Sequence, residues 1–372
     1  MKVALVQDWL TELGGAEKVF SELLAVYPDA DVYTLVYNDH VVEKLGIREE
    51  KLTSSFIQRL PMGRKKYRYY LPFFIRAIES FDLSSYDLII SSSYSVAKGV
   101  LCHSNQTHIC YCHSPVRYAW DLYHQYLRES GVKRGPKAWL IKKELRKLRS
   151  WDVISSNRVD HFISNSDYIK KRISKVYRRE ATTIYPPVLV NDFEPETTKE
   201  DFFITCSRLV PYKKIDMIVE AFKHLPNHRL KVIGSGPDMK KIKAIASPNV
   251  EILGYVPDDI MRREMAKARA FVFAAEEDFG IVPIEAQAAG TPVIAYGKGG
   301  ALETVEDGVS GCFFKEQTVE SLLSGIHSFL ERENTFDPQR VRQNSMKFGV
   351  EEFRTNLQNF VNEKCGTMEL ED

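Results

Sequence analysis

The sequence predicts an α/β protein of two domains, each a parallel sheet with helices wound on both faces. Short apolar runs alternate with stretches of helical periodicity along the whole chain, which is typical of such sheets. The chain has 372 residues, enough for two domains of ordinary size that each bury a core. The alternation is interrupted at Tyr185-Pro186-Pro187, where two prolines exclude a helix.

The first domain opens with a strand over 2–6, a turn at Gly14-Gly15 and a helix over 17–27. This strand-turn-helix order is the usual start of a doubly wound domain. Further buried strands are predicted over 32–36, 88–91, 108–111 and 161–164.

A polar, acidic stretch over 191–201 is a plausible linker to a second series of strands. These strands are predicted over 202–206, 230–233, 250–253, 271–274 and 292–295, and an amphipathic helix over 351–363 follows them. We therefore expect a first domain over 1–188, a second over 189–349, and a C-terminal helix over 350–372. Its acidic end, Glu369 to Asp372, is expected to fray.

Composition excludes several classes of protein. The formal net charge of +1 argues against a nucleic-acid binder, which normally has a strong basic excess. Six cysteines in a chain of this length do not suggest a disulfide framework. No apolar run approaches the length of a membrane span, and residues 1–8 read as a strand rather than a signal peptide. We expect a cytoplasmic protein.

Two carboxylates eight positions apart, Glu277 and Glu285, carry the most specific chemical signal. Glu277 is predicted in the loop after a strand, and Glu285 about one turn inside the next helix. Both would then lie at the carboxyl edge of the sheet, where α/β folds bind ligands, beside a helix N-terminus that suits phosphate. Acids next to an anion site fit a nucleotide sugar, although spacing alone fits a solvated loop and an ordinary helix Glu equally well.

Two cations, Arg208 and Lys213, follow the first strand of the second domain. Such a pair could neutralise a departing diphosphate by charge-assisted hydrogen bonds. A metal is the rival explanation, and Asp29-Ala30-Asp31 is a D-x-D triplet, but it falls at a predicted turn. Cys110 and Cys112 beside His113 invite a zinc site, but no Cys-x-x-Cys pair is present. We expect no metal and no cofactor.

Glycine pairs follow strands in both halves, at Gly14-Gly15 and at Gly234 and Gly236. Glycine there lets the backbone approach a ligand. Neither pair completes the G-x-G-x-x-G fingerprint with a later acid that a nicotinamide oxidoreductase needs. His113 ends a strand before Ser114-Pro115, so it is expected at the carboxyl edge, although a lone His in such a place is more often structural.

These motifs together resemble those of retaining glycosyltransferases of family 4. The resemblance covers nearly the whole chain, and its strongest part is E-x7-E with Phe279-Gly280 inside it and Gly290-Thr291-Pro292 after it. It implies the GT-B architecture: two Rossmann-like doubly wound domains facing a central cleft, with the C-terminal helix crossing back to the first domain.

The resemblance also implies a role for each matching residue. Arg208 and Lys213 would contact the diphosphate; Lys214 stands where the family more often has Gly, which leaves open which lysine does so. Glu277 would bind hydroxyls of the donor sugar and His113 would lie against that sugar. Glu285 would accept the ribose hydroxyls. The remaining implied donor contacts are Gly14, Gly15, Gly234, Gly236, Val256 at the base, and the backbone of Phe279, Gly280, Ile281 and Val282. No protein nucleophile is required, because the leaving phosphate itself takes the acceptor proton.

Two basic segments of the first domain suggest where an acceptor binds. The segment from Arg64 to Phe74 is basic and aromatic, and the segment from Lys133 to Arg149 has eight cations against Glu144. Such segments attract an anionic membrane, although a solvated basic helix is an equal alternative.

Within the family, the stretch over 112–123 and Ile281-Val282 look most like mannosyltransferases of surface-polysaccharide assembly. We therefore expect transfer of mannose from GDP-mannose to a lipid-linked saccharide at the inner face of a bacterial plasma membrane. A UDP-sugar donor, or a non-catalytic GT-B scaffold, is the alternative.

Overall fold

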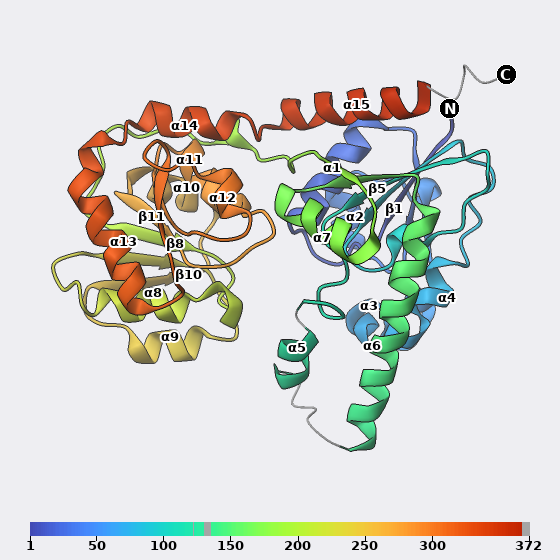
Figure 1. The fold of residues 1–372 in the computed structure, drawn as a ribbon, viewed down its shortest axis with the longest axis horizontal. Coiled ribbons are helices and arrows are strands. Elements are labelled where there is room, and N and C mark those ends of the chain that lie inside the picture. The colour runs from blue at the N-terminus through green and yellow to red at the C-terminus, as the bar shows by residue number, and fades with distance from the viewer. Residues whose placement is uncertain (122, 130–134, 367–372) are drawn as a thin grey trace. The chain divides into compact units, whose positions relative to one another are not determined.

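The computed structural model describes residues 1–121, 123–129 and 135–366, which form two compact units (Figure 1). Residues Met1–Pro186 and the C-terminal residues from Phe353 make the first unit, and Pro187–Glu352 make the second. Each unit is a parallel sheet with helices packed on it, so the predicted two-domain α/β fold is confirmed.

The first sheet has seven parallel strands in the order β3-β2-β1-β4-β5-β6-β7. Its strands are β1 (Val3–Gln7), β2 (Asp31–Thr34), β3 (Leu52–Ser54), β4 (Leu88–Ser93), β5 (Thr107–Cys112), β6 (His161–Ser164) and β7 (Ala181–Thr183). The strand order reverses between β1 and β4, and a crevice opens at such a switch point in doubly wound sheets.

Helices cover both faces of this sheet. They are α1 (Gly15–Val26), α2 (Asp39–Lys44), α3 (Gly63–Lys66), α4 (Phe74–Ile78), α5 (Tyr123–Glu129), α6 (Pro136–Ser155), α7 (Asp167–Tyr177) and α15 (Val350–Gly366). Alternate residues of β1 enter two different cores: Ala4 packs in the cluster that holds Phe74 of α4, whereas Leu5 packs in the cluster that holds Phe20 of α1. The sheet is therefore buried on both sides, as an all-parallel sheet must be.

The second sheet has six parallel strands in the order β10-β9-β8-β11-β12-β13. Its strands are β8 (Phe203–Cys206), β9 (Leu230–Ile233), β10 (Val250–Gly254), β11 (Ala270–Phe273), β12 (Val293–Tyr296) and β13 (Gly311–Phe314). Its helices are α8 (Ile215–Phe222), α9 (Met239–Ile245), α10 (Asp258–Lys267), α11 (Ile281–Ala288), α12 (Ala301–Thr304), α13 (Val319–Arg332) and α14 (Pro338–Met346). The switch point here lies between β8 and β11.

The C-terminal helix α15 packs on the first unit, as expected from the GT-B resemblance. Its apolar side chains recur at helical spacing at Phe353, Leu357, Phe360 and Val361 and are buried in the same core as Leu5. An ion pair of 2.6 Å between Arg354 and Glu22 of α1 adds to this contact. The acidic end from Glu369 lies outside the described residues.

A buried ion pair and its hydrogen bonds join four segments of the first unit. Lys98 and Asp152 are almost completely buried and form a salt bridge. Asp152 also accepts hydrogen bonds from Trp120 Nε1 at 2.8 Å and from the Tyr177 hydroxyl at 3.0 Å. A buried charge is costly without partners, and here each charged group has them. The network connects α6 and α7 to the loops after β4 and β5. Within 1–121, 123–129 and 135–366, no helix has the length and hydropathy that crossing a membrane requires.

Candidate functional site

The strongest candidate site lies at the switch point of the second sheet. The loop after β8 carries Arg208 and Lys213, and the loop after the neighbouring strand β11 carries Glu277. Both loops leave the carboxyl edge of the sheet, where the connections diverge and a ligand can enter. The fold thus brings together residues that are far apart in sequence.

Lys213 and Glu277 form a salt bridge, and their side chains are only 14% and 19% exposed to solvent. The ammonium group neutralises the carboxylate in a partly dehydrated place, so the two loops are joined by a charge-assisted hydrogen bond. Arg208 is exposed and makes no ion pair with any described residue. Its guanidinium is therefore available to an incoming anion.

Glu285 lies inside α11 and is buried, with 8% exposure. Its charge acts on the Cys206 thiol at the end of β8: burial and, to a lesser extent, the Glu285 charge raise the pKa of this thiol to about 12, and the Lys213 charge opposes the shift. Glu285 and Lys213 are thus both near the end of the same strand. The predicted acid pair and the lysine share one region of the second unit.

The turn into α11 depends on Gly280, which adopts a left-handed conformation with φ of 93° immediately before Ile281. No side chain caps this helix start, and Pro283 has no N–H, so the first free donors are the N–H groups of Ile281 and Val282. The Phe279 side chain is buried against Phe348, with ring centroids 5.6 Å apart. Phe279 can therefore offer a ligand its backbone and not its ring.

A third glycine pair, Gly299-Gly300, packs against this loop, and the sequence analysis did not identify it. The Gly300 N–H donates to the Glu277 carbonyl at 2.8 Å. A Cβ at Gly300 would lie 2.3 Å from Phe279 Cα, and one at Gly299 would lie 2.4 Å from the Glu277 carbonyl oxygen. The only sequence signal was a Gly-Gly pair shortly after a strand.

Gly234 and Gly236 have a packing role that the sequence did not show. A Cβ at Gly234 would lie 1.8 Å from the Ser207 carbonyl oxygen, and one at Gly236 would lie 2.3 Å from that of Leu209. Their loop therefore lies directly against the loop that carries Arg208. Val256, the predicted base contact, follows β10 and is partly exposed.

Lys214 adopts a left-handed conformation, with φ of 58°, at the start of α8. This backbone geometry favours glycine, which explains why glycine suits this position. Lys213, directly before it, is the lysine that pairs with Glu277.

In the first unit, Gly14 caps α1 and Gly15 is its first residue, so the helix begins two residues before the predicted start at 17. The Gly14 N–H donates to the Glu17 carboxylate at 2.9 Å, and Gln7 Nε2 lies 3.4 Å from the other oxygen of Glu17. Burial raises the pKa of Glu17. One donor of this helix start is thus already bound to a protein carboxylate.

His113 follows β5 and is partly buried at the carboxyl edge of the first sheet. Its Nε2 lies 2.8 Å from Ser92 Oγ, and its ring contacts the rings of Tyr111 and Tyr94 with centroids 5.1 and 5.9 Å apart. Burial lowers the pKa of His113 to about 3. The ring is therefore neutral at physiological pH.

The two metal hypotheses find little support in the geometry. Asp31 accepts from the Tyr86 hydroxyl at 2.7 Å and pairs with Lys51 at 3.1 Å, while Asp29 is 98% exposed. Cys110 and Cys112 are free thiols buried in β5. In the part of the chain that the structure describes, no three His, Cys, Asp or Glu side chains are grouped to hold a metal ion.

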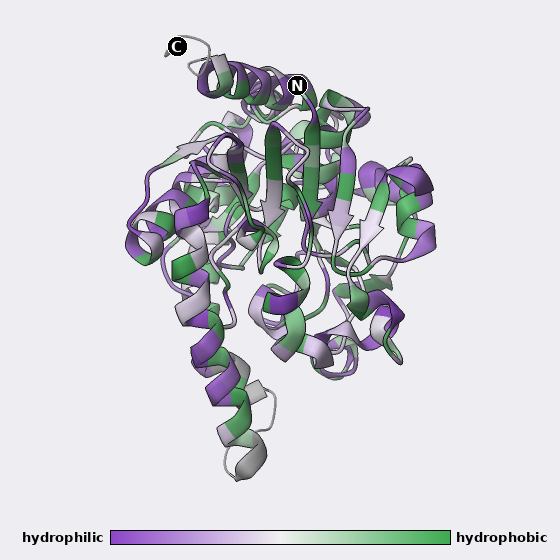
Figure 2. Ribbon diagram, turned by 90° about the vertical axis from the view of Figure 1, so that its right-hand side faces the viewer, coloured by the Kyte–Doolittle hydropathy of each residue, from purple (hydrophilic) through white to green (hydrophobic). Residues whose placement is uncertain are grey.

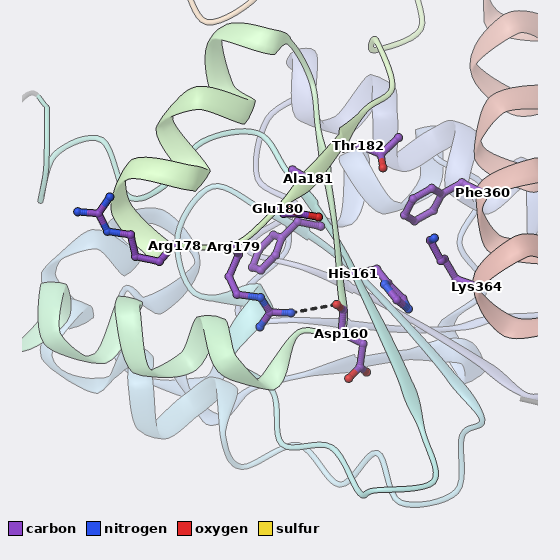
Figure 3. Close-up of a pocket in the computed structure, with 10 residues that line it drawn as sticks. Asp160, His161, Arg178, Arg179, Glu180, Ala181, Thr182, Phe360 and Lys364 are labelled. Carbon is purple, nitrogen blue, oxygen red and sulfur yellow. Dashed lines mark hydrogen bonds between the residues drawn. The ribbon is translucent and has the colours of Figure 1, made fainter. Parts of the chain in front are cut away.

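A shallow pocket lies at the opposite, amino edge of the first sheet, between the starts of β6 and β7 and the end of α15 (Figure 3). Arg179 donates to the Asp160 carbonyl at 3.0 Å and to two other backbone carbonyls nearby. Its charge therefore supports the local backbone, and we assign the pocket no part in the chemistry.

Comparisons with known proteins identify the family. Residues 13–191 match the family model described as Glycosyltransferase Family 4, and residues 191–348 match the one described as Glycosyl transferases group 1. The GDP-mannose-dependent alpha-(1-6)-phosphatidylinositol monomannoside mannosyltransferase of Mycolicibacterium smegmatis is 30% identical over 155 residues, which are 37% of this chain and 39% of that protein. An uncharacterised glycosyltransferase of Methanocaldococcus jannaschii is 29% identical over 203 residues, 52% of this chain and 56% of that protein.

Each match thus spans little more than half of the curated relative, or less. Among solved structures, HepE of Anabaena in complex with UDP-glucose has a TM-score of 0.71 and 18% identity, with 98% of this chain and all of that chain covered. The two family models together cover residues 13–348. The chain belongs to the group 1 and family 4 glycosyltransferases and has their GT-B fold.

Proposed function

We propose that the protein transfers a hexose, with retention of configuration, from a nucleoside diphosphate sugar to a saccharide acceptor. The observation that supports this most is the salt bridge between Lys213 and Glu277 at the switch point of the second sheet. Arg208 lies on the same loop as Lys213, and the charge of Glu285 acts on the same strand end. In this proposal the second domain (189–349) binds the donor and the first (1–188) binds the acceptor.

The proposed chemistry needs only groups that this site offers. Arg208 and Lys213 stabilise the negative charge that builds on the diphosphate as the anomeric bond breaks. Glu277 accepts hydrogen bonds from hydroxyls of the donor sugar, and Glu285 accepts those of the ribose. The departing phosphate oxygen takes the proton of the acceptor hydroxyl, so the acceptor oxygen forms the new bond without a protein nucleophile.

The cation pair makes a metal ion unnecessary in this scheme. Arg208→Ala is expected to reduce turnover about 10²–10³-fold, because removing one such stabilising donor has this effect in other sites. The loss should be the same with and without a chelator. If wild-type activity disappears on adding the chelator, a metal ion takes the role that we give to the cations.

The donor is proposed to be GDP-mannose. The mycobacterial relative is a GDP-mannose-dependent mannosyltransferase, whereas HepE was crystallised with UDP-glucose, so a UDP-sugar is the second candidate. A thermal-shift panel of GDP, UDP, ADP and NAD separates them: the largest stabilisation by GDP supports the proposal, and by UDP the second candidate. Stabilisation by NAD alone contradicts both, and no response to any nucleotide favours a scaffold.

The acceptor is proposed to be a lipid-linked saccharide at an anionic membrane. Helix α6 leads back to the amino end of β6 and so runs antiparallel to the strands. It extends past the sheet, and apolar and polar residues alternate along it (Figure 2). Near its start, Trp139 and Leu140 are 64% and 51% exposed, and Lys142 and Lys143 beside them are exposed.

The packing of this helix is amphipathic. Ala138, Leu145 and Leu148 are buried, whereas the Arg149 guanidinium is bound to the Ala119 carbonyl at 3.0 Å and is less available to a membrane. Lys133 and Arg134 lie outside the described residues.

The other basic segment, from Arg64 to Phe74, follows β3 and therefore lies beyond the carboxyl edge of the first sheet. Of its aromatic residues, Tyr67 and Phe74 are buried in the core, and its most exposed ring is Tyr69.

A liposome assay tests the membrane proposal. Wild-type protein should sediment with anionic vesicles and less with neutral ones, and salt should weaken the binding. Lys142→Glu with Lys143→Glu should abolish it. The matched control is Lys170→Glu with Lys171→Glu, an adjacent exposed pair on α7. Equal sedimentation with both vesicle types, unchanged by salt, contradicts the electrostatic attachment.

A further inference from the structure

Two serine–histidine pairs join the neighbouring strands β4 and β5 in the first sheet. Ser91 Oγ lies 2.8 Å from His108 Nε2, and Ser92 Oγ lies 2.8 Å from His113 Nε2. Ser91 and Ser92 are both completely buried. The two pairs therefore have the same chemistry, one at the start of β5 and one just after its end.

The first pair shows how the protons are arranged. His108 Nδ1 lies 3.1 Å from the Arg158 carbonyl oxygen, and a carbonyl can only accept, so Nδ1 carries the proton. Burial lowers the pKa of His108 to about 4, which keeps the ring neutral. Nε2 is then an acceptor, and the Ser91 hydroxyl donates to it. Both ring nitrogens of His108 are satisfied by the protein.

In the second pair, the hydrogen-bonding options of Ser92 indicate the same proton position on the histidine ring. The Ser92 hydroxyl has His113 Nε2 as its sole hydrogen-bond partner among the described residues. If Nε2–H donated to Ser92, the hydroxyl proton would be buried without an acceptor, which costs about 1–3 kcal/mol. The Ser92 hydroxyl therefore donates to Nε2, and the proton of the neutral ring is on Nδ1. His113 Nδ1, unlike His108 Nδ1, has no hydrogen-bond partner in the described part of the chain.

The ring of His113 is also held in orientation. Its backbone N–H donates to the Ser93 carbonyl at 2.9 Å, and the Tyr94 and Tyr111 rings both contact it. Tyr94 itself begins a turn whose four N–H groups, residues 94–97, donate to the buried carboxylate of Asp8 at 2.6–2.8 Å. A turn bound at four points gives the ring little freedom.

We propose that Ser92 is a positioning residue, which fixes His113 as the Nδ1–H tautomer so that it presents a single N–H donor to an uncharged oxygen of the sugar. This inference rests on the proposed function and on the place that the family resemblance implies for His113, against the donor sugar. It also assigns His113 a donor role only, since its acceptor nitrogen is occupied by Ser92. His113 cannot then act as the base that deprotonates the acceptor.

The direct test is two-bond ¹H–¹⁵N correlation NMR of the full chain labelled at histidine, which distinguishes the two neutral tautomers. The wild-type protein should show His113 as Nδ1–H from pH 5 to 8, with His113→Gln to assign the signal. Ser92→Ala should shift His113 toward the Nε2–H tautomer. Detection of Nε2–H in the wild-type protein, or an unchanged tautomer in Ser92→Ala, overturns the proposal.

Transfer kinetics give the second readout, with Ser91→Ala as the matched control. Ser92→Ala should lower kcat about tenfold, the effect of one misplaced hydrogen bond, with the nucleotide Kd unchanged. Ser92→Thr, which keeps the hydroxyl, should restore both the tautomer and kcat. Ser91→Ala should keep kcat, because Arg158 still holds the His108 tautomer. Equal loss of kcat in Ser91→Ala and Ser92→Ala contradicts a specific role. A protein with the Nδ1–H tautomer but without transfer from any nucleotide sugar contradicts the proposed function and leaves the assignment of the tautomer supported.

Discussion

Replacing Glu277 by Gln is expected to tighten nucleoside diphosphate binding and to lower turnover. In the free protein Lys213 is bound to Glu277, and both side chains are largely shielded from water. A hydrogen bond to a charged group contributes about 1.5–3 kcal/mol. A diphosphate that binds the Lys213 ammonium group must compete with the Glu277 carboxylate for it. Residual exposure and salt reduce the repulsion between carboxylate and phosphate. We expect a gain of about 1 kcal/mol, or a Kd about fivefold lower.

Isothermal titration with GDP and with UDP, in the presence of a chelator, measures this change. Turnover of Glu277→Gln should fall at least about tenfold, because the sugar hydroxyls lose an ionised acceptor. Lys213→Met should weaken GDP binding. The matched control is Glu264→Gln, which breaks a Lys–Glu pair of similar burial with Lys231 outside the site loops. If Glu277→Gln weakens GDP binding as much as Lys213→Met does, the reasoning is refuted.

Three further predictions concern the loops and a buried histidine. Gly300→Ala should lower both Tm and nucleotide affinity, because its Cβ would lie 2.3 Å from Phe279 Cα, whereas Gly297→Ala, with nothing nearer than 3.4 Å, should change little in thermal melts and titration. Lys214→Gly should raise the free energy of unfolding by about 0.5 kcal/mol in urea titrations. Glycine removes the strain of the left-handed backbone at this position, and this gain outweighs the larger conformational entropy that glycine gives the unfolded chain. It should leave turnover intact; a turnover loss like that of Lys213→Met would mean that Lys214 contacts the diphosphate. The pKa of His108 is about 4 in the folded protein and about 6.5 in the unfolded chain. As the pH falls below about 6.5, the proton binds to the unfolded chain before it binds to the folded protein, so the free energy of unfolding decreases. Between pH 6.5 and 5 the wild-type protein should lose about 1.5 kcal/mol more than His108→Gln in urea unfolding, and equal losses would refute the assignment.

The sequence predicted the central strands of both sheets but not three of the edge strands. The strands over 88–93 and 107–112 are buried on both faces, and such strands read as unbroken apolar or small-residue runs. The edge strands β3 and β7 have three residues each and are half-exposed, and β13 begins with glycine. Strands as short and exposed as β3 and β7 have too little burial to produce a pattern. Strand β13 is mostly buried, but its glycine shortens the apolar run.

The candidate site was predictable where a residue's position along the chain determines its place in the sheet. Arg208, Lys213 and Glu277 follow strands that proved to be neighbours, and parallel strands end at one edge. Pairing of Lys213 with Glu277 depends on strand order and side-chain geometry, which spacing does not contain. The same holds for Gly299-Gly300, whose need for glycine arises from contact with a loop about twenty residues away in sequence.

Asp8 is a further residue that sequence reasoning could not identify. It follows β1 as an ordinary acid in the sequence, yet its carboxylate accepts four backbone N–H groups from a turn almost ninety residues later. A residue that stabilises the backbone of another segment has no local signature, because its partners are main-chain groups common to all residues. Such contacts become visible only in the folded chain.

A crystal structure of the protein with GDP and magnesium tests the central claim most directly. The account predicts β-phosphate oxygens within hydrogen-bond distance of the Arg208 guanidinium and the Lys213 ammonium group, with both ribose hydroxyls donating to Glu285. Phosphate oxygens coordinated to magnesium, or lying away from both cations, would contradict it.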